Sequence, residues 1–205
     1  MTNNFTPIFF GALPIFRLDG VYKPNENDIN YLKSIKYTQD NNGFKLSDSV
    51  NILDNLQLVD IKKCIEYNFN EYKKNILEIE NDFYISQSWS TINKKNSMHT
   101  KHNHPNTLFS CVLYVKAINS GITFYNKKSA IQQAFNFSYK IKEYNIHNSS
   151  TWKLPVSTGD MVIFPGHIEH SSFVNENDDE RIIVGANFFI KGEIGIKENV
   201  DRIII

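Results

Sequence analysis

Residues 181–190 read RIIVGANFFI, and this stretch decides the fold class. Its aliphatic and aromatic content predicts a β-strand, in which side chains alternate between two faces. One face would be wholly apolar and would carry Ile182, Val184, Ala186, Phe188 and Ile190. The other face would carry Arg181, Ile183, Gly185, Asn187 and Phe189.

The arginine that begins this strand needs an explanation. On a largely apolar inward face, Arg181 requires an anionic partner, because guanidinium cannot lose its charge by releasing a proton. The fork of its N–H groups fits a carboxylate. The alternative is that Arg181 reaches solvent or pairs with Asp178, Asp179 or Glu180.

Other elements can be placed around this strand. Further strands are predicted over residues 83–92, 107–115, 122–125 and 161–164, punctuated by Gly121, Gly159, Pro165 and Gly166. Helices are predicted over residues 25–35 and 55–79, the second because apolar residues recur at three- and four-residue steps. Residues 39–49 are expected to form a surface loop, and the long polar segment 126–158 is a candidate lid.

These elements predict a single domain of the mainly β (α+β) class. A helical N-terminal part, 1–82, would precede a β core, 83–190, and a C-terminal tail, 191–205. Many short strands after two helices favour a sandwich or barrel with the helices packed on one sheet.

The composition argues against several functions. The chain has 205 residues, and its 22 basic side chains match 22 acidic ones, so no net field attracts nucleic acid or an anionic membrane. The apolar runs are far shorter than the about 20 residues of a membrane span, and the N-terminus does not resemble a secretory signal. Cys64 and Cys111 are expected to be buried free thiols, which favours a reducing, cytoplasmic location.

Histidine is distributed unevenly. Five of the six histidines fall within residues 98–105 and 164–170. On an extended chain His102 and His104 point to the same side, so both imidazoles can reach one metal ion. His170 follows a predicted strand and can supply the third ligand. Surface or core histidines without a metal are the alternative interpretation.

Three protein ligands would suit redox chemistry. They leave up to three positions of an octahedral ion open for co-substrate and dioxygen. A closed structural zinc site would instead use cysteines, and neither cysteine has a ligand-type spacing.

Together these motifs resemble those of the 2-oxoglutarate/Fe(II)-dependent oxygenases, and more closely a bacterial and phage branch of them. The segment His102-Asn103-His104-Pro105 is similar to the first metal motif of that branch, with Ser88-Trp89 before it and Ser110 and Tyr114 after it. The run Gly159-Asp160-Met161-Val162-Ile163-Phe164-Pro165 then leads to His170, Arg181 and Asn187. The similarity extends over nearly the whole chain.

The resemblance implies a double-stranded β-helix, or jelly roll, and a set of roles. His102, His104 and His170 would bind Fe(II), and Arg181 would hold the far carboxylate of 2-oxoglutarate. Asn187, Tyr114 and Ser110 would line the same pocket. His99 and His167 would lie in the cleft or behind the ligands, and Trp89 would be core packing.

One feature departs from the wider superfamily. His104 stands where a carboxylate ligand is usual, so the site would be one unit more positive, which would affect iron retention and would admit other metals. The closer branch shares this histidine. Glu169 alternates away from His170 and is not expected to be a ligand.

The resemblance implies hydroxylation of a substrate by dioxygen, with release of succinate and carbon dioxide. Two alternatives stay open. One is a cupin-like three-histidine metalloenzyme that does not use 2-oxoglutarate, and the other is a jelly-roll module without catalysis. The prime substrate and the oligomeric state, a homodimer included, cannot be read from the sequence.

Overall fold

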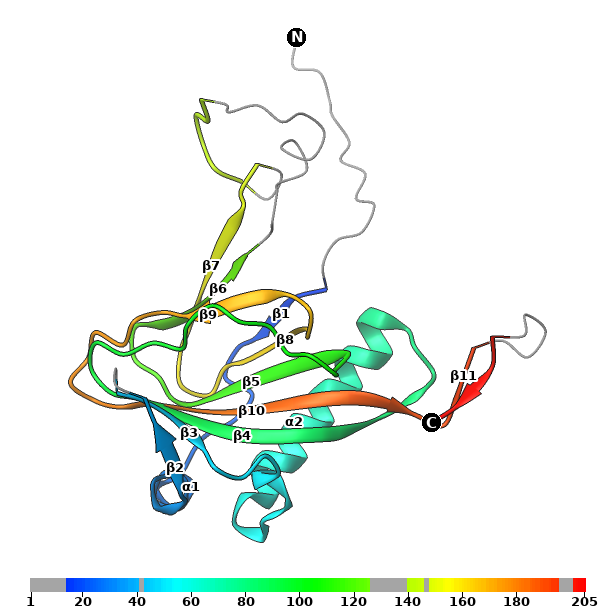
Figure 1. Ribbon diagram of the computed structural model, residues 1–205, viewed down its shortest axis with the longest axis horizontal. Helices are drawn as coiled ribbons and strands as arrows, with labels where there is room; N and C mark the ends of the chain where they lie inside the picture. The colour runs from blue at the N-terminus through cyan, green and yellow to red at the C-terminus, as the bar shows by residue number, and fades with distance from the viewer. Residues whose placement is uncertain (1–13, 41–42, 126–139, 146–147, 196–200) are drawn as a thin grey trace.

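The computed structural model describes residues 14–40, 43–125, 140–145, 148–195 and 201–205. Two antiparallel sheets form most of this structure (Figure 1). The larger sheet has the strand order β1 (Phe16–Leu18), β8 (Met161–Pro165), β5 (Phe109–Lys116), β10 (Arg181–Lys191), β4 (Asp82–Asn93), β3 (Phe44–Ser47), β2 (Tyr37–Gln39). The smaller sheet has the order β7 (Thr151–Val156), β6 (Ser120–Tyr125), β9 (Glu169–Ser172). The C-terminal residues add a hairpin of β11 (Glu193–Ile194) and β12 (Ile203–Ile204).

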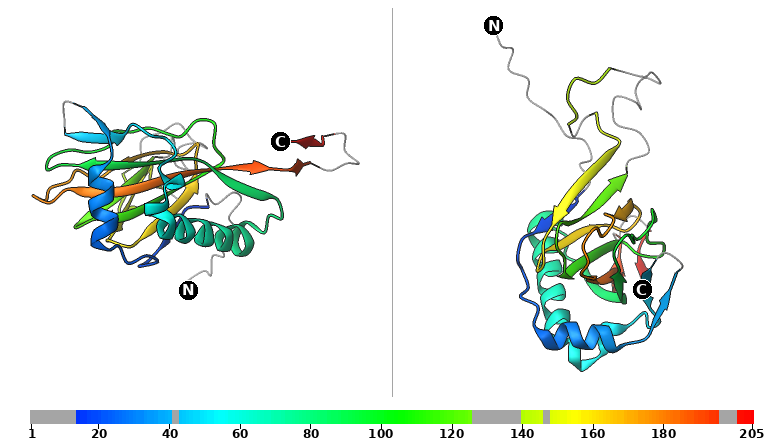
Figure 2. Two further views of the ribbon diagram at one scale, coloured as in Figure 1. Left: turned by 90° about the horizontal axis from the view of Figure 1, so that it is seen from below. Right: turned by 90° about the vertical axis from the view of Figure 1, so that its left-hand side faces the viewer.

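Both predicted helices are present, and Figure 2 shows them on the side of the larger sheet that faces away from the smaller one. Helix α1 spans Glu26–Ser34 and begins at a capping box, in which the side chains of Asn25 and Asp28 bond each other's backbone N–H groups. The second helical region starts with short 3-10 turns, Ile52–Asp54 and Leu56–Leu58.

That second region continues as α2 (Val59–Tyr72) and a π-helical turn, Lys73–Leu77. It ends at Glu78, which has a left-handed backbone with φ of 51°. No helix among the described residues is both long and apolar enough to cross a bilayer.

The larger sheet buries a different set of residues on each face. The helix-facing side of β10 contributes Ile182, Val184, Ala186 and Phe188 to a core shared with α2. There Phe69 stacks on Phe188, with 3.7 Å between ring centroids and 6° between planes. The alternation read from the sequence is therefore confirmed, and the mainly β class with helices on one sheet is confirmed with it.

A second core cluster lies between the two sheets. It gathers the opposite faces of the same strands, including Val112 and Tyr114 of β5, Phe164 of β8 and Ile183 of β10, together with Phe124 of β6. This inner layer gives way to polar side chains where β9 and the segment before β5 come together.

Three expectations about local structure need correction or restriction. Residues 39–49 are not simply a loop, because β2 and β3 pair as an edge hairpin in which Tyr37 lies opposite Ser47. Strands of three and four residues are too short for an alternating pattern to distinguish them from a loop. Cys64 is only partly buried, although both cysteines are free thiols. Much of the lid candidate, 126–139 and 146–147, lies outside the described residues.

Candidate metal centre

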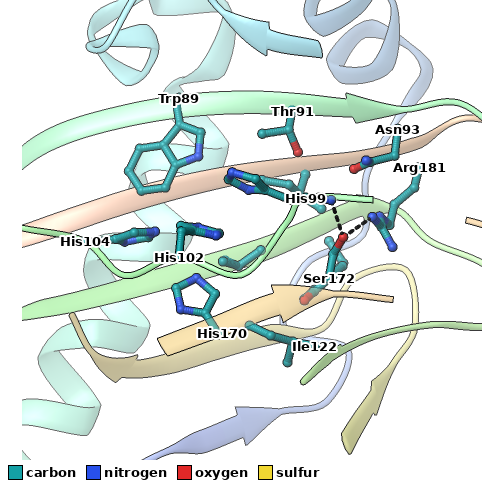
Figure 3. A pocket seen from close by; sticks show the side chains of 13 residues that line it. Trp89, Thr91, Asn93, His99, His102, His104, Ile122, His170, Ser172 and Arg181 are labelled. Carbon is teal, nitrogen blue, oxygen red and sulfur yellow. Dashed lines mark hydrogen bonds between the residues drawn. The ribbon is translucent and has the colours of Figure 1, made fainter. Parts of the chain in front are cut away.

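Three histidines meet at one end of the inner layer (Figure 3). His102 and His104 lie on the extended segment before β5, and His170 lies on β9. The two segments are held together by reciprocal backbone hydrogen bonds between His102 and His170, with N···O distances of 2.9 and 2.8 Å. Each imidazole offers one nitrogen to a group in which all three atoms lie within 4.8 Å of one another.

The Nδ1 atom of each of these rings faces a hydrogen-bond acceptor. His102 Nδ1 is 2.7 Å from the Thr100 carbonyl oxygen, and His170 Nδ1 is 2.9 Å from the Ile168 carbonyl oxygen. A carbonyl can only accept, so Nδ1 carries the proton in the neutral ring and Nε2 keeps its lone pair. This arrangement is typical of metal-binding histidines, whose second nitrogen donates to a fixed acceptor.

His104 has a different support, built from side chains of three strands. Its Nδ1 lies 2.6 Å from Ser110 Oγ of β5 and 3.0 Å from Asn187 Oδ1 of β10. The Ser110 hydroxyl donates to Asn187 Oδ1 at 2.7 Å, and the Asn187 amide donates to Gln87 Oε1 of β4 at 2.9 Å. These three residues are register partners across neighbouring strands, so the sheet itself aligns them.

Burial keeps the three rings neutral. The pKa of His170 is lowered to about 3 and that of His104 to about 4, mainly by desolvation and in part by the neighbouring His102 ring. Desolvation also lowers the pKa of His102. Neutral imidazole is the metal-binding form, so the site needs no proton release before it can bind an ion near neutral pH.

The donor set fits a divalent transition metal. It consists of three imidazole nitrogens with preset tautomers, which suits iron, copper, nickel or zinc better than magnesium or calcium. Within the described residues this triad is the one group of histidine, cysteine and acidic side chains with metal-binding geometry. Glu169 is directed away from it and pairs with Lys101 at 3.0 Å, as expected from the sequence.

Arg181 is buried, at 3% exposure, on the same side of the larger sheet as the triad. Its guanidinium donates to the Ser172 hydroxyl and the Phe173 carbonyl, both at 2.7 Å, and to the Ser120 hydroxyl at 3.2 Å. No carboxylate pairs with it among the described residues. The nearby acids Asp178, Asp179 and Glu180 pair instead with Lys95, Lys116 and Lys33.

Arg181 and the triad line one cavity of about 40 Å³, which we call the inner cavity. Its wall also includes Thr91, Tyr114 and His99. Burial raises the pKa of the Tyr114 hydroxyl, which therefore stays protonated, and it has no hydrogen-bond partner in the described part of the chain. Figure 3 shows Ser172 between the triad and Arg181, accepting bonds from the Arg181 guanidinium and the His99 backbone N–H.

The other site residues predicted from the sequence do not all lie in the inner cavity. Tyr114 lines the inner cavity with Arg181, whereas Ser110 and Asn187 are not part of its wall and contact His104. His99 lines the cavity, with its ring stacked between His102 and Phe44 at centroid distances of 3.7 and 4.4 Å.

Two expectations were wrong. His167 is exposed and lies outside the cavity wall, because the turn before β9 directs it to solvent. Trp89 is not core packing. It lies edge-on to His104 at 5.1 Å and covers Gly185 of the next strand, where an added Cβ would lie 2.5 Å from the indole.

Sequence reasoning also missed Ser120, Ser172 and Gln87. Serine and glutamine are common, and no pattern in the sequence distinguishes these three from surface residues. Their importance follows from the register of β4, β6 and β9 around Arg181 and Asn187, which only the structure supplies.

The fold and site define a class of metal-binding double-stranded β-helix proteins, and the comparisons agree. Residues 87–187 match the family model described as "Putative 2OG-Fe(II) oxygenase". No curated protein matches the chain. Among solved structures, the α-ketoglutarate-dependent epimerase SnoN from nogalamycin biosynthesis matches with a TM-score of 0.63 and 9% identity, covering 86% of this chain and 78% of that one.

Two further structures extend this likeness. HygX from Streptomyces hygroscopicus, with nickel and 2-oxoglutarate bound, gives a TM-score of 0.60 at 7% identity, covering 86% of this chain and 82% of that one. A Pseudomonas putida prolyl-4-hydroxylase gives 0.57 at 9% identity, covering 88% and 95%. These structures show the fold. Residues 87–187, which contain the three histidines and Arg181, match the non-haem iron and 2-oxoglutarate oxygenase family.

Proposed function

We propose that this protein is a 2-oxoglutarate- and Fe(II)-dependent dioxygenase that hydroxylates a substrate and releases succinate and carbon dioxide. The observation that carries the proposal is that three convergent imidazoles line the same inner cavity as a buried arginine that has no acidic partner among the described residues. Bound together, iron and 2-oxoglutarate would supply the chemistry by which dioxygen oxidises both the co-substrate and a substrate C–H bond.

In this proposal the histidines hold the metal ion in a fixed orientation. His102, His104 and His170 would each bind it through Nε2, because Nδ1 is occupied by an acceptor in every case. The backbone bonds between His102 and His170 would keep the two ligand-bearing segments from separating. Fixed ligands lower the reorganisation needed at the reacting centre.

Arg181 would bind the far carboxylate of 2-oxoglutarate. The Ser172 and Ser120 hydroxyls and the Phe173 carbonyl accept three of its hydrogen bonds and so orient the guanidinium, which has further N–H groups to donate. The Tyr114 hydroxyl could donate a second bond to the same carboxylate. A charge-assisted pair in a buried site is stronger than one in water.

The inner cavity is narrow for a five-carbon dicarboxylate. Its volume of about 40 Å³ would accommodate a metal ion and a few water molecules, so we propose that a side chain moves when the co-substrate binds. His99 is the natural candidate, since stacking holds its ring and no hydrogen bond to a described residue does. Its displacement toward the surface would widen the cavity between the triad and Arg181.

Anaerobic titration tests the proposal. Apo-protein would receive Fe(II) and then 2-oxoglutarate, while the weak visible charge-transfer band of the chelate is followed. We expect the band to appear in the wild-type protein and to be lost in Arg181→Ala at the same co-substrate concentration. Metal binding without a band at millimolar co-substrate would favour the cupin-like alternative, which gives Arg181 no role.

A further inference from the structure

A second hollow lies on the other side of the histidines. We call it the outer cleft. It measures about 330 Å³ and its wall includes Leu46, Val50, Gln87, Pro105 and Asn106. Four residues line both hollows, namely Trp89, His99, His102 and His104. The outer cleft therefore shares its innermost wall with the candidate metal centre, and a molecule seated there would lie against the ligand histidines.

The two hollows differ in charge. The inner cavity contains the Arg181 guanidinium, whereas the described residues of the outer cleft include no lysine, arginine, aspartate or glutamate. A charged group that entered the outer cleft would lose water and gain no opposite charge, which is costly.

The cleft also has a defined pattern of apolar and polar groups. Leu46 and Val50 are 40% and 54% exposed, and Trp89 of the neighbouring strand β4 lines the same cleft. The Gln87 carboxamide accepts a bond from Asn187 and retains its own N–H groups. Asn106 has a left-handed backbone, with φ of 58°, and its side chain has no hydrogen-bond partner in the described part of the chain.

From this pattern we infer that the outer cleft binds the prime substrate as an uncharged, planar, mainly apolar group that carries a carboxamide-like hydrogen-bonding edge. The apolar face would pack against Trp89, Leu46 and Val50, and the polar edge would bond the carboxamides of Gln87 and Asn106. Such pockets are commonly apolar with a few placed polar groups. The role of the cleft as a substrate site rests on the proposed function, whereas its preference for uncharged ligands rests on its own wall.

The edge hairpin supplies much of this specificity. Leu46 and Ser47 come from β3, and Val50 follows it, while Phe44 of the same strand stacks on His99. The segment that the sequence suggested to be a surface loop is thus one side of the cleft. Changes in it would alter substrate choice without contact with the metal ligands.

Three isosteric probes test the inference, namely benzamide, benzamidinium and benzoate, which share a planar shape and differ in charge. The chain has two tryptophans, so Trp152→Phe leaves Trp89 as the fluorescence reporter in the full-length, metal-free protein. We expect benzamide to quench Trp89 and to bind at least about tenfold more tightly than either ion, since a desolvated charge costs more than 1.4 kcal/mol. Equal affinities, tighter binding of an ion or no binding of benzamide would overturn the inference.

Two substitutions, one inside the outer cleft and one outside it, each introduce an acidic side chain and form a matched pair. Val50→Asp should weaken benzamide binding and reverse the order in favour of benzamidinium, whereas Val59→Asp, at a 38% exposed valine on α2, should leave the order unchanged. An unchanged order in Val50→Asp would contradict the assignment. Benzoate that binds through Arg181 would be recognised because its quenching is lost in Arg181→Ala.

The iron and 2-oxoglutarate band separates this inference from the proposed function. Val50→Asp should retain the band, because Val50 does not line the inner cavity. A normal band with no preference for benzamide would defeat the outer-cleft inference alone. Preference for benzamide without any band would defeat the proposed function and leave the cleft as an uncharged-ligand site.

Discussion

The two faces of strand β10 have the same backbone and opposite tasks. The helix-facing side is continuous hydrocarbon, in which Val184 and Phe188 pack against α2. The side toward the smaller sheet carries a buried cation at Arg181, a bare backbone at Gly185 and an amide at Asn187. One face stabilises the fold by removing apolar surface from water. The other face positions buried polar groups, and the stability from the first face offsets the cost of burying them.

Stability and chemistry therefore depend on different faces of this sheet. Damage to the helix-facing side should lower the free energy of unfolding and spare the metal centre. Damage to the other side should change metal or co-substrate affinity and spare the fold. Four substitutions examine this separation, beginning with the largest expected effect.

His170→Ala should abolish specific metal binding. It removes one of three ligands, and the remaining pair cannot fix an ion as firmly. Isothermal titration with Fe(II) under anaerobic conditions measures the effect, and far-UV circular dichroism checks the fold. His167→Ala is the matched control, because that histidine lies three residues away and is exposed. Retention of full affinity in His170→Ala would remove it from the metal site.

Phe69→Ala should destabilise the protein by about 3–5 kcal/mol, the usual cost of deleting a buried aromatic ring. Phe69 is 1% exposed and stacks on Phe188, opposite the metal-facing side of the sheet. Urea denaturation gives the free energy of unfolding. The folded fraction should bind metal with unchanged affinity. Tyr67→Ala, on the exposed side of the same helix, should change stability by less than about 0.5 kcal/mol.

Arg181→Ala should weaken 2-oxoglutarate binding by about 10- to 150-fold, the equivalent of the about 1.5–3 kcal/mol typical of a hydrogen bond to a charged group. Metal affinity should remain near that of the wild type, since Arg181 does not contact the triad. Calorimetric titration of the metal-loaded protein provides both numbers. Arg202→Ala, an exposed arginine paired with Glu193, is the control. Equal losses of metal and co-substrate affinity would argue that Arg181 is structural.

Ser110→Ala should lower metal affinity by about tenfold, the smaller end of the effect of removing a group that orients a ligand histidine. The hydroxyl links His104 Nδ1 to Asn187, and without it the imidazole loses one of its two fixed contacts. Ser171→Ala, at a buried serine bonded to Tyr125, controls for loss of a buried hydroxyl. An equal decrease in both variants would show a general packing effect.

Local sequence pattern predicted the parts of the site that depend on spacing. The two-residue step between His102 and His104, and the place of Arg181 at the start of a strand, are visible along the chain. The sequence could not reveal which strands become neighbours. The contact of Ser110 with Asn187 and of Asn187 with Gln87 depends on register across three strands.

Trp89 illustrates the same limit. An aromatic residue on a predicted strand is usually core, yet Trp89 pairs with Gly185, whose missing side chain leaves room for the indole beside the histidines. The edge strands β2 and β3 escaped prediction for another reason, because segments of three and four residues are too short for alternation to identify a strand. Both omissions affect the outer cleft, so no pattern along the chain indicated the substrate.

The most direct test is a crystal structure of the protein crystallised anaerobically with Fe(II) and 2-oxoglutarate. We predict one metal ion bonded to the Nε2 atoms of His102, His104 and His170. A carboxylate of 2-oxoglutarate should contact the Arg181 guanidinium, and the His99 ring should have left its present stack. A metal ion bound elsewhere, or a co-substrate that makes no contact with Arg181, would contradict this prediction.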